Sequence, residues 1–251
     1  MIIDSPSPRT ITGIKRYQGV LRQIEASVLK MIPEVNRINA AMSKLAGLSE
    51  DMRILSLNAE LAAGRAGTKG ASVRALTQYT RGLVRRLLDI NESTAGQISL
   101  YRRCTSSLVC LRYLRHIETA SAKLGTALQG GLAQHASLAL DKARHRYLEQ
   151  VVTHIEGLIG AIVDVARLVR VVDDVVSQAE SIATNIATEA VSAGRHEAEF
   201  MAVAESMRHY IEELRLMNDR SAKAIRLSER GCRRMRDALT GLERQGTLLA
   251  A

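Results

Sequence analysis

The side chains that most often carry enzyme chemistry are scattered along this chain of 251 residues. No nucleophile motif or phosphate-binding glycine loop is present, and the three cysteines form no CxxC pair, which favours reduced thiols. No two of the six histidines have the i, i+4 spacing that holds zinc on a helix. We therefore expect no enzyme activity, no cofactor and no metal. The cysteines and histidines are Cys104, Cys110, Cys232, His116, His135, His145, His154, His196 and His209.

The formal net charge is +9, which can favour nucleic acid, an anionic membrane or an acidic protein. The arginines are spread over many helical turns, with local pairs at 85–86, 102–103 and 233–234. No aromatic residues are interleaved with them to stack on bases. The sequence therefore argues against a nucleic-acid partner and favours a charged, solvated face.

The composition predicts an all-α, elongated protein. The chain has no Trp, one Phe and three Pro, and good helix formers dominate it. A narrow core of Ala, Val, Ile and Leu suits packed long helices. No apolar run approaches the roughly 20 residues of a membrane span, and the N-terminus lacks a signal-peptide pattern. We expect a soluble, cytoplasmic protein without a membrane span.

Apolar residues recur at alternating steps of three and four, the heptad pattern of a coiled coil. The pattern predicts four helices: one from residue 21, one from Val73 to about Leu124, one from Leu148 to Ala193, and one from about Phe200 to Leu242. Pro33 falls inside the first of them and should kink that helix or start it afresh. The first seam consists of Leu21, Ile24, Val28, Met31, Val35, Ile38, Met42 and Leu45.

A segment occurs twice, 127 residues apart. Residues 58–81 and 185–208 both begin with Asn, carry Ala-Gly at the same point and end with Arg. Between residues 58 and 103, 13 of the 46 pairs at this offset are identical. The chain is therefore predicted to be a tandem repeat of a long helical hairpin.

Two such hairpins can bury their apolar stripes against each other. The prediction is an elongated antiparallel four-helix coiled-coil bundle made by one chain, a rod of roughly 75 Å at 1.5 Å per residue. Residues 1–10 are expected to be a disordered leader. Hairpin 1 spans residues 11–128 with its tip near 67–70, and hairpin 2 spans 132–246 with its tip near 194–198. Gly130-Gly131 should turn the chain between them.

The tips resemble the signalling tip of methyl-accepting chemotaxis proteins, whose typical run contains LNAAIEAARAG. Hairpin 1 matches in "ILSLNAELAAGRAG" at 57–59 and 65–67, and Arg81 occupies the position of the arginine at the end of the family's run. Hairpin 2 matches at Asn185, at 189–190, 193–194 and 203–204, and at Phe200 and Arg208. The resemblance implies a chemoreceptor-like signal-transduction or scaffold protein in which one chain replaces a receptor dimer.

The family also implies partners and contact residues. Association between receptors would use one group of residues in each hairpin, so that each hairpin keeps half of one charge pair. The groups are Ile54, Asn58, Ala62 and Arg65 in hairpin 1 and Ser181, Asn185, Glu189 and Ser192 in hairpin 2. A CheA-type kinase or CheW-type coupling protein would meet the turns. There the family's charged residues are replaced, so coupling should be weak. The candidate tip contacts are Ile54, Asn58, Arg65, Gly67, Thr68, Ala71, Arg81, Asn185, Glu189, Gly194, Arg195, Phe200 and Arg208.

Plainer interpretations stay open. The paired Asn residues could set register inside a coiled coil, the paired Gly residues could be ordinary turn glycines, and the late Arg residues could be solvated. The chain could also be a coiled-coil adaptor without chemotaxis partners that binds an acidic protein or an anionic surface. Self-association through the tip is a further expectation.

Overall fold

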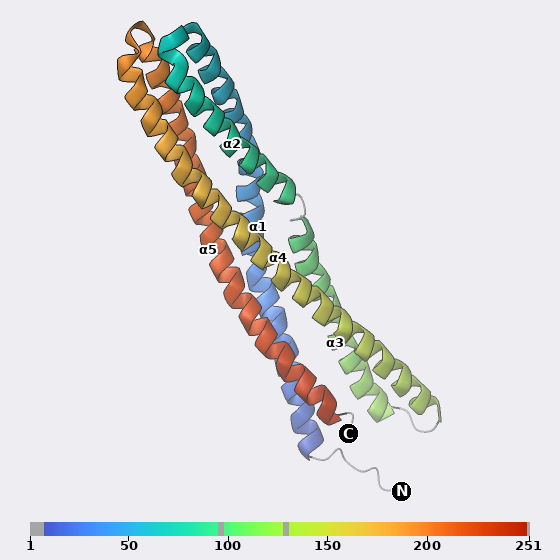
Figure 1. Ribbon diagram of the computed structural model, residues 1–251. Coiled ribbons are helices and arrows are strands. Elements are labelled where there is room, and N and C mark those ends of the chain that lie inside the picture. The colour runs from blue at the N-terminus through green and yellow to red at the C-terminus, as the bar shows by residue number, and fades with distance from the viewer. Residues whose placement is uncertain (1–7, 95–97, 128–130, 250–251) are drawn as a thin grey trace. The chain divides into compact units, whose positions relative to one another are not determined.

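The computed structural model describes residues 8–94, 98–127 and 131–249, and all described elements are helical (Figure 1). The predicted all-α fold is therefore confirmed, whereas the antiparallel four-helix arrangement of the whole chain stays a prediction. No helix in these ranges is long and apolar enough to cross a bilayer. The elements are α1 (Pro8–Arg65), η1 (Gly67–Gly70), α2 (Ala71–Thr94), α3 (Ile98–Ala127), α4 (Gly131–Ser192), η3 (Gly194–His196) and α5 (Glu197–Leu249).

Helix α1 differs in part from two expectations. It begins at Pro8, so residues 8–10 of the expected leader are helical, while residues 1–7 lie outside the described part. Proline suits the first helical position because its missing N–H would have no partner there. The helix also continues through Pro33 without restarting. The side chains of Met31 and Val35 on either side are buried at 1% and 0% exposure, and this packing stabilises the turn that lacks a hydrogen bond.

Other helix boundaries differ from the expected ones in part. The single helix expected from Val73 to Leu124 is described as α2 and α3, and residues 95–97 between them lie outside the described part. Helix α4 begins at Gly131, and residues 128–130 of the expected turn also lie outside it.

The heptad seams are buried as predicted. All eight positions of the first seam, from Leu21 to Leu45, are at most 4% exposed. Along α4 the buried residues change from Val and Ile to Ala at Ala179, Ala183 and Ala190. Smaller side chains allow helices to approach more closely, although Ile182 and Ile186 are buried among these alanines.

The chain forms two compact units, and each combines segments of both hairpins. Unit 1 consists of Met1–Val35, Ser99–Ile162 and Arg226–Ala251, and unit 2 of Asn36–Ile98 and Val163–Ile225. The two tips thus belong to unit 2, together with the parts of α1, α2, α4 and α5 that lead to them.

Each hairpin in unit 2 is closed by bonds between its own helices. In hairpin 1, Arg81 of α2 pairs with Glu60 of α1. In hairpin 2, Arg215 of α5 pairs with Glu180 of α4. The midpoints of these two pairs lie 127 residues apart along the chain, which is the repeat offset. The two hairpins therefore pair their helices in the same register.

Candidate functional site at the hairpin tips

The two tips turn the chain in the same way. Gly67 and Gly194 have φ of 61° and 63°, a left-handed conformation that favours glycine. The residues before them, Ala66 and Ala193, have φ of −74° and −78° with ψ of −10° in both. A short 3₁₀ turn follows in each case. Both glycines are therefore turn residues, as one of the sequence interpretations held.

The tips differ three residues later. A Cβ on Gly70 would lie 2.2 Å from the carbonyl oxygen of Ala63, so this position in hairpin 1 accepts only glycine without a backbone shift. The equivalent position in hairpin 2 is Glu197, the exposed first residue of α5. The first turn thus lies tightly against α1. In hairpin 2 the helix that follows the turn begins one repeat position earlier than in hairpin 1.

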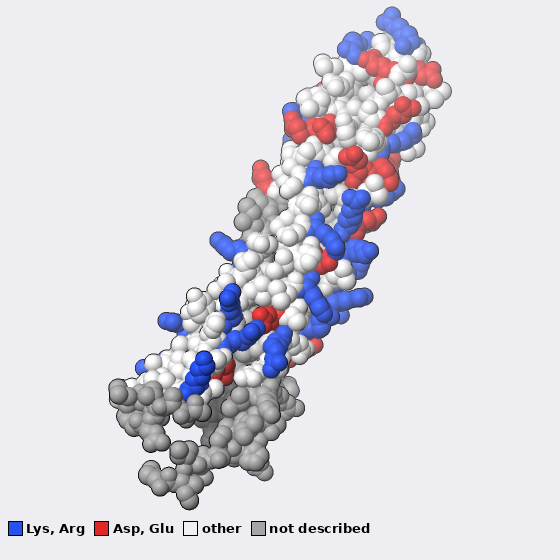
Figure 2. Space-filling view, turned by 180° about the vertical axis from the view of Figure 1, so that it is seen from behind, with Lys and Arg blue, Asp and Glu red and all other residues white. Residues whose placement is uncertain are grey.

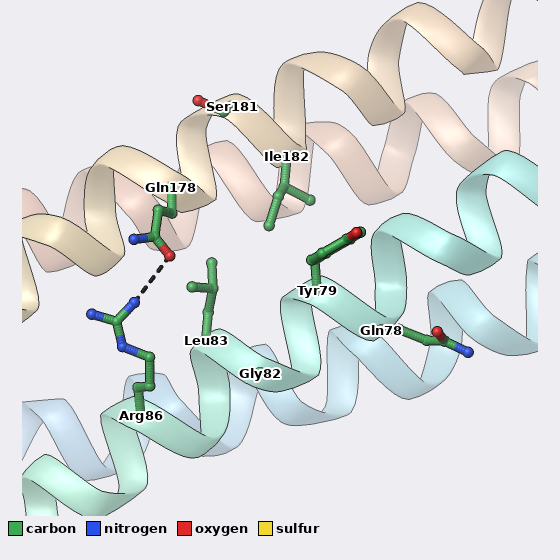
Figure 3. A pocket seen from close by; sticks show the side chains of 8 residues that line it. All are labelled: Gln78, Tyr79, Gly82, Leu83, Arg86, Gln178, Ser181 and Ile182. Atoms are coloured by element: carbon green, nitrogen blue, oxygen red, sulfur yellow. Dashed lines mark hydrogen bonds between the residues drawn. The ribbon is translucent and has the colours of Figure 1, made fainter.

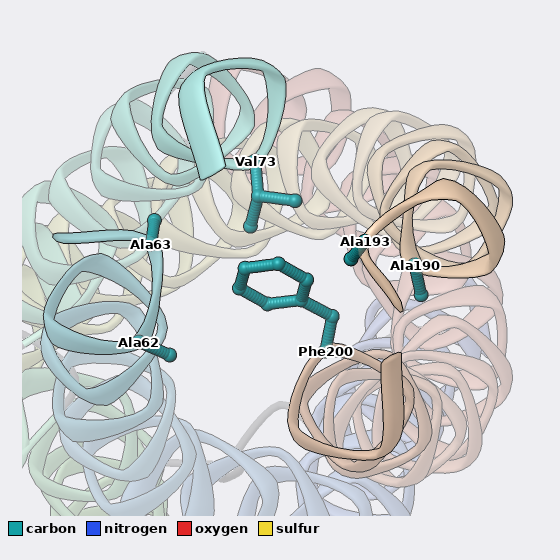
Figure 4. Packing of buried hydrophobic residues seen from close by; sticks show 6 residues of the cluster. All are labelled: Ala62, Ala63, Val73, Ala190, Ala193 and Phe200. Atoms are coloured by element: carbon teal, nitrogen blue, oxygen red, sulfur yellow. The ribbon is translucent and has the colours of Figure 1, made fainter. Parts of the chain in front are cut away.

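A shared apolar core joins the tips (Figure 4). The ring of Phe200 points inward with Val73 across from it, and these two residues occupy equivalent positions in the repeat. Ala63 and Ala190 form a second equivalent pair in this cluster. Phe200 is completely buried, so it is not a partner contact as the resemblance implied. Its side chain fills the space that the small alanines of the repeat leave.

An ion pair also links the hairpins. Arg65 of α1 donates to a carboxylate oxygen of Glu199 on α5, and His196 lies 3.6 Å from the other oxygen. The bond from Arg65, with a smaller effect of His196, holds the pKa of Glu199 below its usual range. Arg65 was expected to be half of an intermolecular charge pair with Glu189 as the other half. Its partner in the structure is Glu199 of the same chain, which the resemblance to the family did not predict.

The two Asn residues of the repeat lie on the surface. Asn58 and Asn185 are both exposed, so they do not set register inside a coiled coil. Of the turn residues expected to meet a kinase or coupling protein, Thr68, Ala71 and Arg195 are also exposed. These side chains are placed where a partner can reach them.

Hairpin 1 carries three exposed large apolar side chains on one face beside its tip. Ile54, Leu57 and Leu61 of α1 are 45%, 40% and 64% exposed, at a spacing that places them on one side of the helix. The equivalent residues of α4 are Ser181, Thr184 and Thr188. Each of these hydroxyls donates to the carbonyl four residues earlier on its own helix. These three positions are thus apolar in hairpin 1 and hydroxyl-bearing in hairpin 2, where Val191, 70% exposed, is the large apolar side chain on that side of α4.

Of the remaining candidate tip residues, one forms an ion pair within its hairpin and two form none with the residues that the structure describes. Arg81 pairs with Glu60 across its hairpin, so it is not simply solvated. Its repeat equivalent, Arg208, is exposed and forms no ion pair among the described residues. Glu189 is half-buried and likewise has no ion-pair partner in the described part of the chain.

A shallow pocket lies between α2 and α4 below the tips (Figure 3). Tyr79, Leu83 and Ile182 give it an apolar lining, and Arg86 donates a 2.9 Å hydrogen bond to Gln178 across it. Its lining has the hydroxyls of Tyr79 and Ser181 but no carboxylate, histidine or thiol, and the Ser181 hydroxyl donates to the carbonyl of Ser177. The described residues also contain no group of three or more His, Cys, Asp or Glu that could hold a metal ion.

Comparison with known proteins adds no relative: no protein-family model matches the chain, and no curated protein or solved structure matches it.

Proposed function

We propose that the chain is a chemoreceptor-like signalling scaffold that acts through its tips, with one chain in the role of a receptor dimer. Two turns with the same backbone conformation support this proposal, because they occur at the repeat offset and share one apolar core. A receptor dimer brings together two identical hairpins. Here the two hairpins have diverged within one chain.

The observation that carries the proposal is the apolar face of Ile54, Leu57 and Leu61. Three large apolar side chains at this level of exposure on one helix face are typical of an interaction surface. The exposed Asn58 lies beside them. It occupies a position at which receptors of the chemoreceptor family contact one another. Because hairpin 2 has hydroxyls on the equivalent face, the scaffold engages one receptor hairpin through hairpin 1.

The turns favour association over kinase control. The chemoreceptor family has an acidic and a basic residue at these positions of each hairpin. Here Thr68, Ala71 and Ala198 are exposed but uncharged, and the exposed Arg195 replaces an acidic residue with a basic one. We therefore expect weak binding to a CheA-type kinase or a CheW-type coupling protein and stronger binding to receptor tips.

Disulfide trapping tests the proposal. Asn58→Cys is mixed with a purified receptor signalling fragment that carries a cysteine at its matching tip Asn, under mild oxidation. The native thiols Cys104, Cys110 and Cys232 interfere little, because they are buried and burial raises the pKa of each. Trapping should be rapid with Asn58→Cys. It should be lost when Ile54→Ser, Leu57→Thr and Leu61→Thr give hairpin 1 the face of hairpin 2.

The matched control alters the other hairpin. Ser181→Ala, Thr184→Ala and Thr188→Ala change three exposed residues at the equivalent positions and should leave trapping unchanged. Equal loss in both triple variants, or trapping that ignores the apolar face, would show that the tip is not the binding surface. The adaptor interpretation would then be favoured.

A further inference from the structure

The positive charge of the chain belongs to one of its two units. Unit 1 contains 19 of the 35 Lys and Arg residues and 10 of the 26 Asp and Glu residues, a net charge of +9. Unit 2 contains 16 of each and is neutral. The surplus that looked dispersed along the sequence therefore belongs to unit 1, whereas the tips that carry the proposed function belong to unit 2.

Helix α5 presents the densest part of this charge. At 100° per residue, Arg226, Arg230, Arg233 and Arg234 fall within an arc of about 100° on one side of the helix. All four are exposed, and none forms an ion pair within the described residues. Gly231 and Cys232, between them in sequence, are buried on the opposite side, where Gly231 meets the side chain of Met31. The four guanidinium groups thus face solvent together.

The surface view agrees with this distribution. Figure 2 shows a face on which Lys and Arg side chains gather beside the residues drawn in grey, with few Asp or Glu among them. Elsewhere on that face the two signs are mixed. The exposed Asp237 lies on the same side of α5 and offsets one of the four positive charges. The charges that remain repel each other, so an arrangement of this kind favours a polyanionic partner.

We propose that this arginine face of α5 binds the phosphate backbone of a duplex nucleic acid. A guanidinium group matches the geometry of a phosphate and binds it in a bidentate way. From Arg226 to Arg234 the helix rises about 12 Å, which along the duplex axis corresponds to three to four nucleotides of one strand at about 3.4 Å each. The contacts are to the backbone, so the binding is independent of base sequence.

A membrane surface fits this face less well. Helices that lie on membranes carry large apolar side chains beside their cations. Between Arg226 and Asp237, Leu227 is the one exposed apolar side chain, at 39%. The proposal is independent of the proposed tip function, because the arginines lie in unit 1 and the tips in unit 2.

Fluorescence anisotropy with a labelled 20-base-pair DNA of arbitrary sequence tests the proposal on the full chain. The test variant is Arg226→Gln, Arg230→Gln, Arg233→Gln and Arg234→Gln. The control is Arg74→Gln, Arg85→Gln, Arg170→Gln and Arg220→Gln. The control arginines are also exposed and form no ion pair in the described part, but they lie in unit 2. Both variants lower the net charge by the same four units, and circular dichroism checks that both stay helical.

We expect the affinity of the unaltered protein to fall with salt, with a log–log slope of about −3.6 for four phosphate contacts. The test variant should bind at least tenfold more weakly at 100 mM salt and lose about three units of that slope. The control should change the affinity less than threefold. If both variants bound DNA equally weakly, the loss would follow from net charge alone, and the proposal would be overturned. Tighter binding to phosphatidylserine vesicles or to poly-glutamate than to DNA would also overturn it.

Discussion

Arg65 of α1 and Glu199 of α5 form an ion pair that joins the two hairpins at their tips. In the chemoreceptor family that the tips resemble, such an arginine contacts a neighbouring receptor. Here the chain supplies its own carboxylate, so the tip is internally neutralised at this point. The exposed side chains of Ile54, Leu57 and Leu61 lie on the same helix, before Arg65 in sequence.

Reversing Arg65 tests this internal role. Arg65→Glu places two carboxylates together and should lower the free energy of unfolding by up to about 1 kcal/mol, since the arginine side chain is 63% exposed and the pair is screened by water. The double swap with Glu199→Arg should restore most of the loss. Urea unfolding of the single and double variants gives the coupling energy. A double swap no more stable than Arg65→Glu alone would mean that the pair contributes nothing.

Removing the aromatic ring at the tip core should cost far more. Phe200→Ala leaves a cavity at a completely buried site, and we expect a loss of about 3–5 kcal/mol in the free energy of unfolding. Val73→Ala, at the equivalent repeat position, removes fewer atoms and should cost less. Chemical denaturation measures both. A cost below about 1 kcal/mol for Phe200→Ala would contradict the packing in Figure 4.

The two turn glycines should respond alike to substitution. Gly67→Ala and Gly194→Ala each force a Cβ into the left-handed region, at a cost of roughly 1–2 kcal/mol. Gly47→Ala is the control, because Gly47 lies inside α1 with open space around it, and alanine there should be neutral or stabilising by up to about 1 kcal/mol. Thermal unfolding monitored by circular dichroism compares the three. A control as damaging as the turn variants would exclude a backbone cause.

Alkaline pH should destabilise the fold through two buried thiols. Burial raises the pKa of Cys104 to about 11 and that of Cys232 to about 12, whereas an unfolded thiol ionises near pH 9. From about pH 9 up to those values the unfolded chain binds fewer protons than the folded one, so stability falls as pH rises. Below pH 8 these thiols add no pH dependence.

The comparison uses Cys104→Ala with Cys232→Ala. Urea unfolding at pH 8 and pH 10.5 should show a smaller alkaline loss in this double variant than in the unaltered protein. Tyr17, whose pKa burial raises to about 12, titrates in both proteins and cancels. Identical losses would show that the thiols are not the cause.

Much of the local structure follows from sequence pattern alone. The first seam, from Leu21 to Leu45, is buried throughout because heptad spacing places every one of its residues on the same helix face. The turns at Gly67 and Gly194 could be located because few other residues adopt a positive φ. The helix does not restart at Pro33, because the packing on either side of it, which a local rule about a lost hydrogen bond omits, stabilises that turn.

The sequence by itself determined that the chain is helical, where its apolar seams lie and that its tips repeat after 127 residues, since these are periodic properties of neighbouring residues. Only the tertiary structure decided which charges meet, because partners such as Arg65 and Glu199 are 134 residues apart and belong to different hairpins. The same holds for the burial of Phe200 and for the gathering of the net positive charge in unit 1. These depend on which helix faces pack together, and no local spacing encodes that.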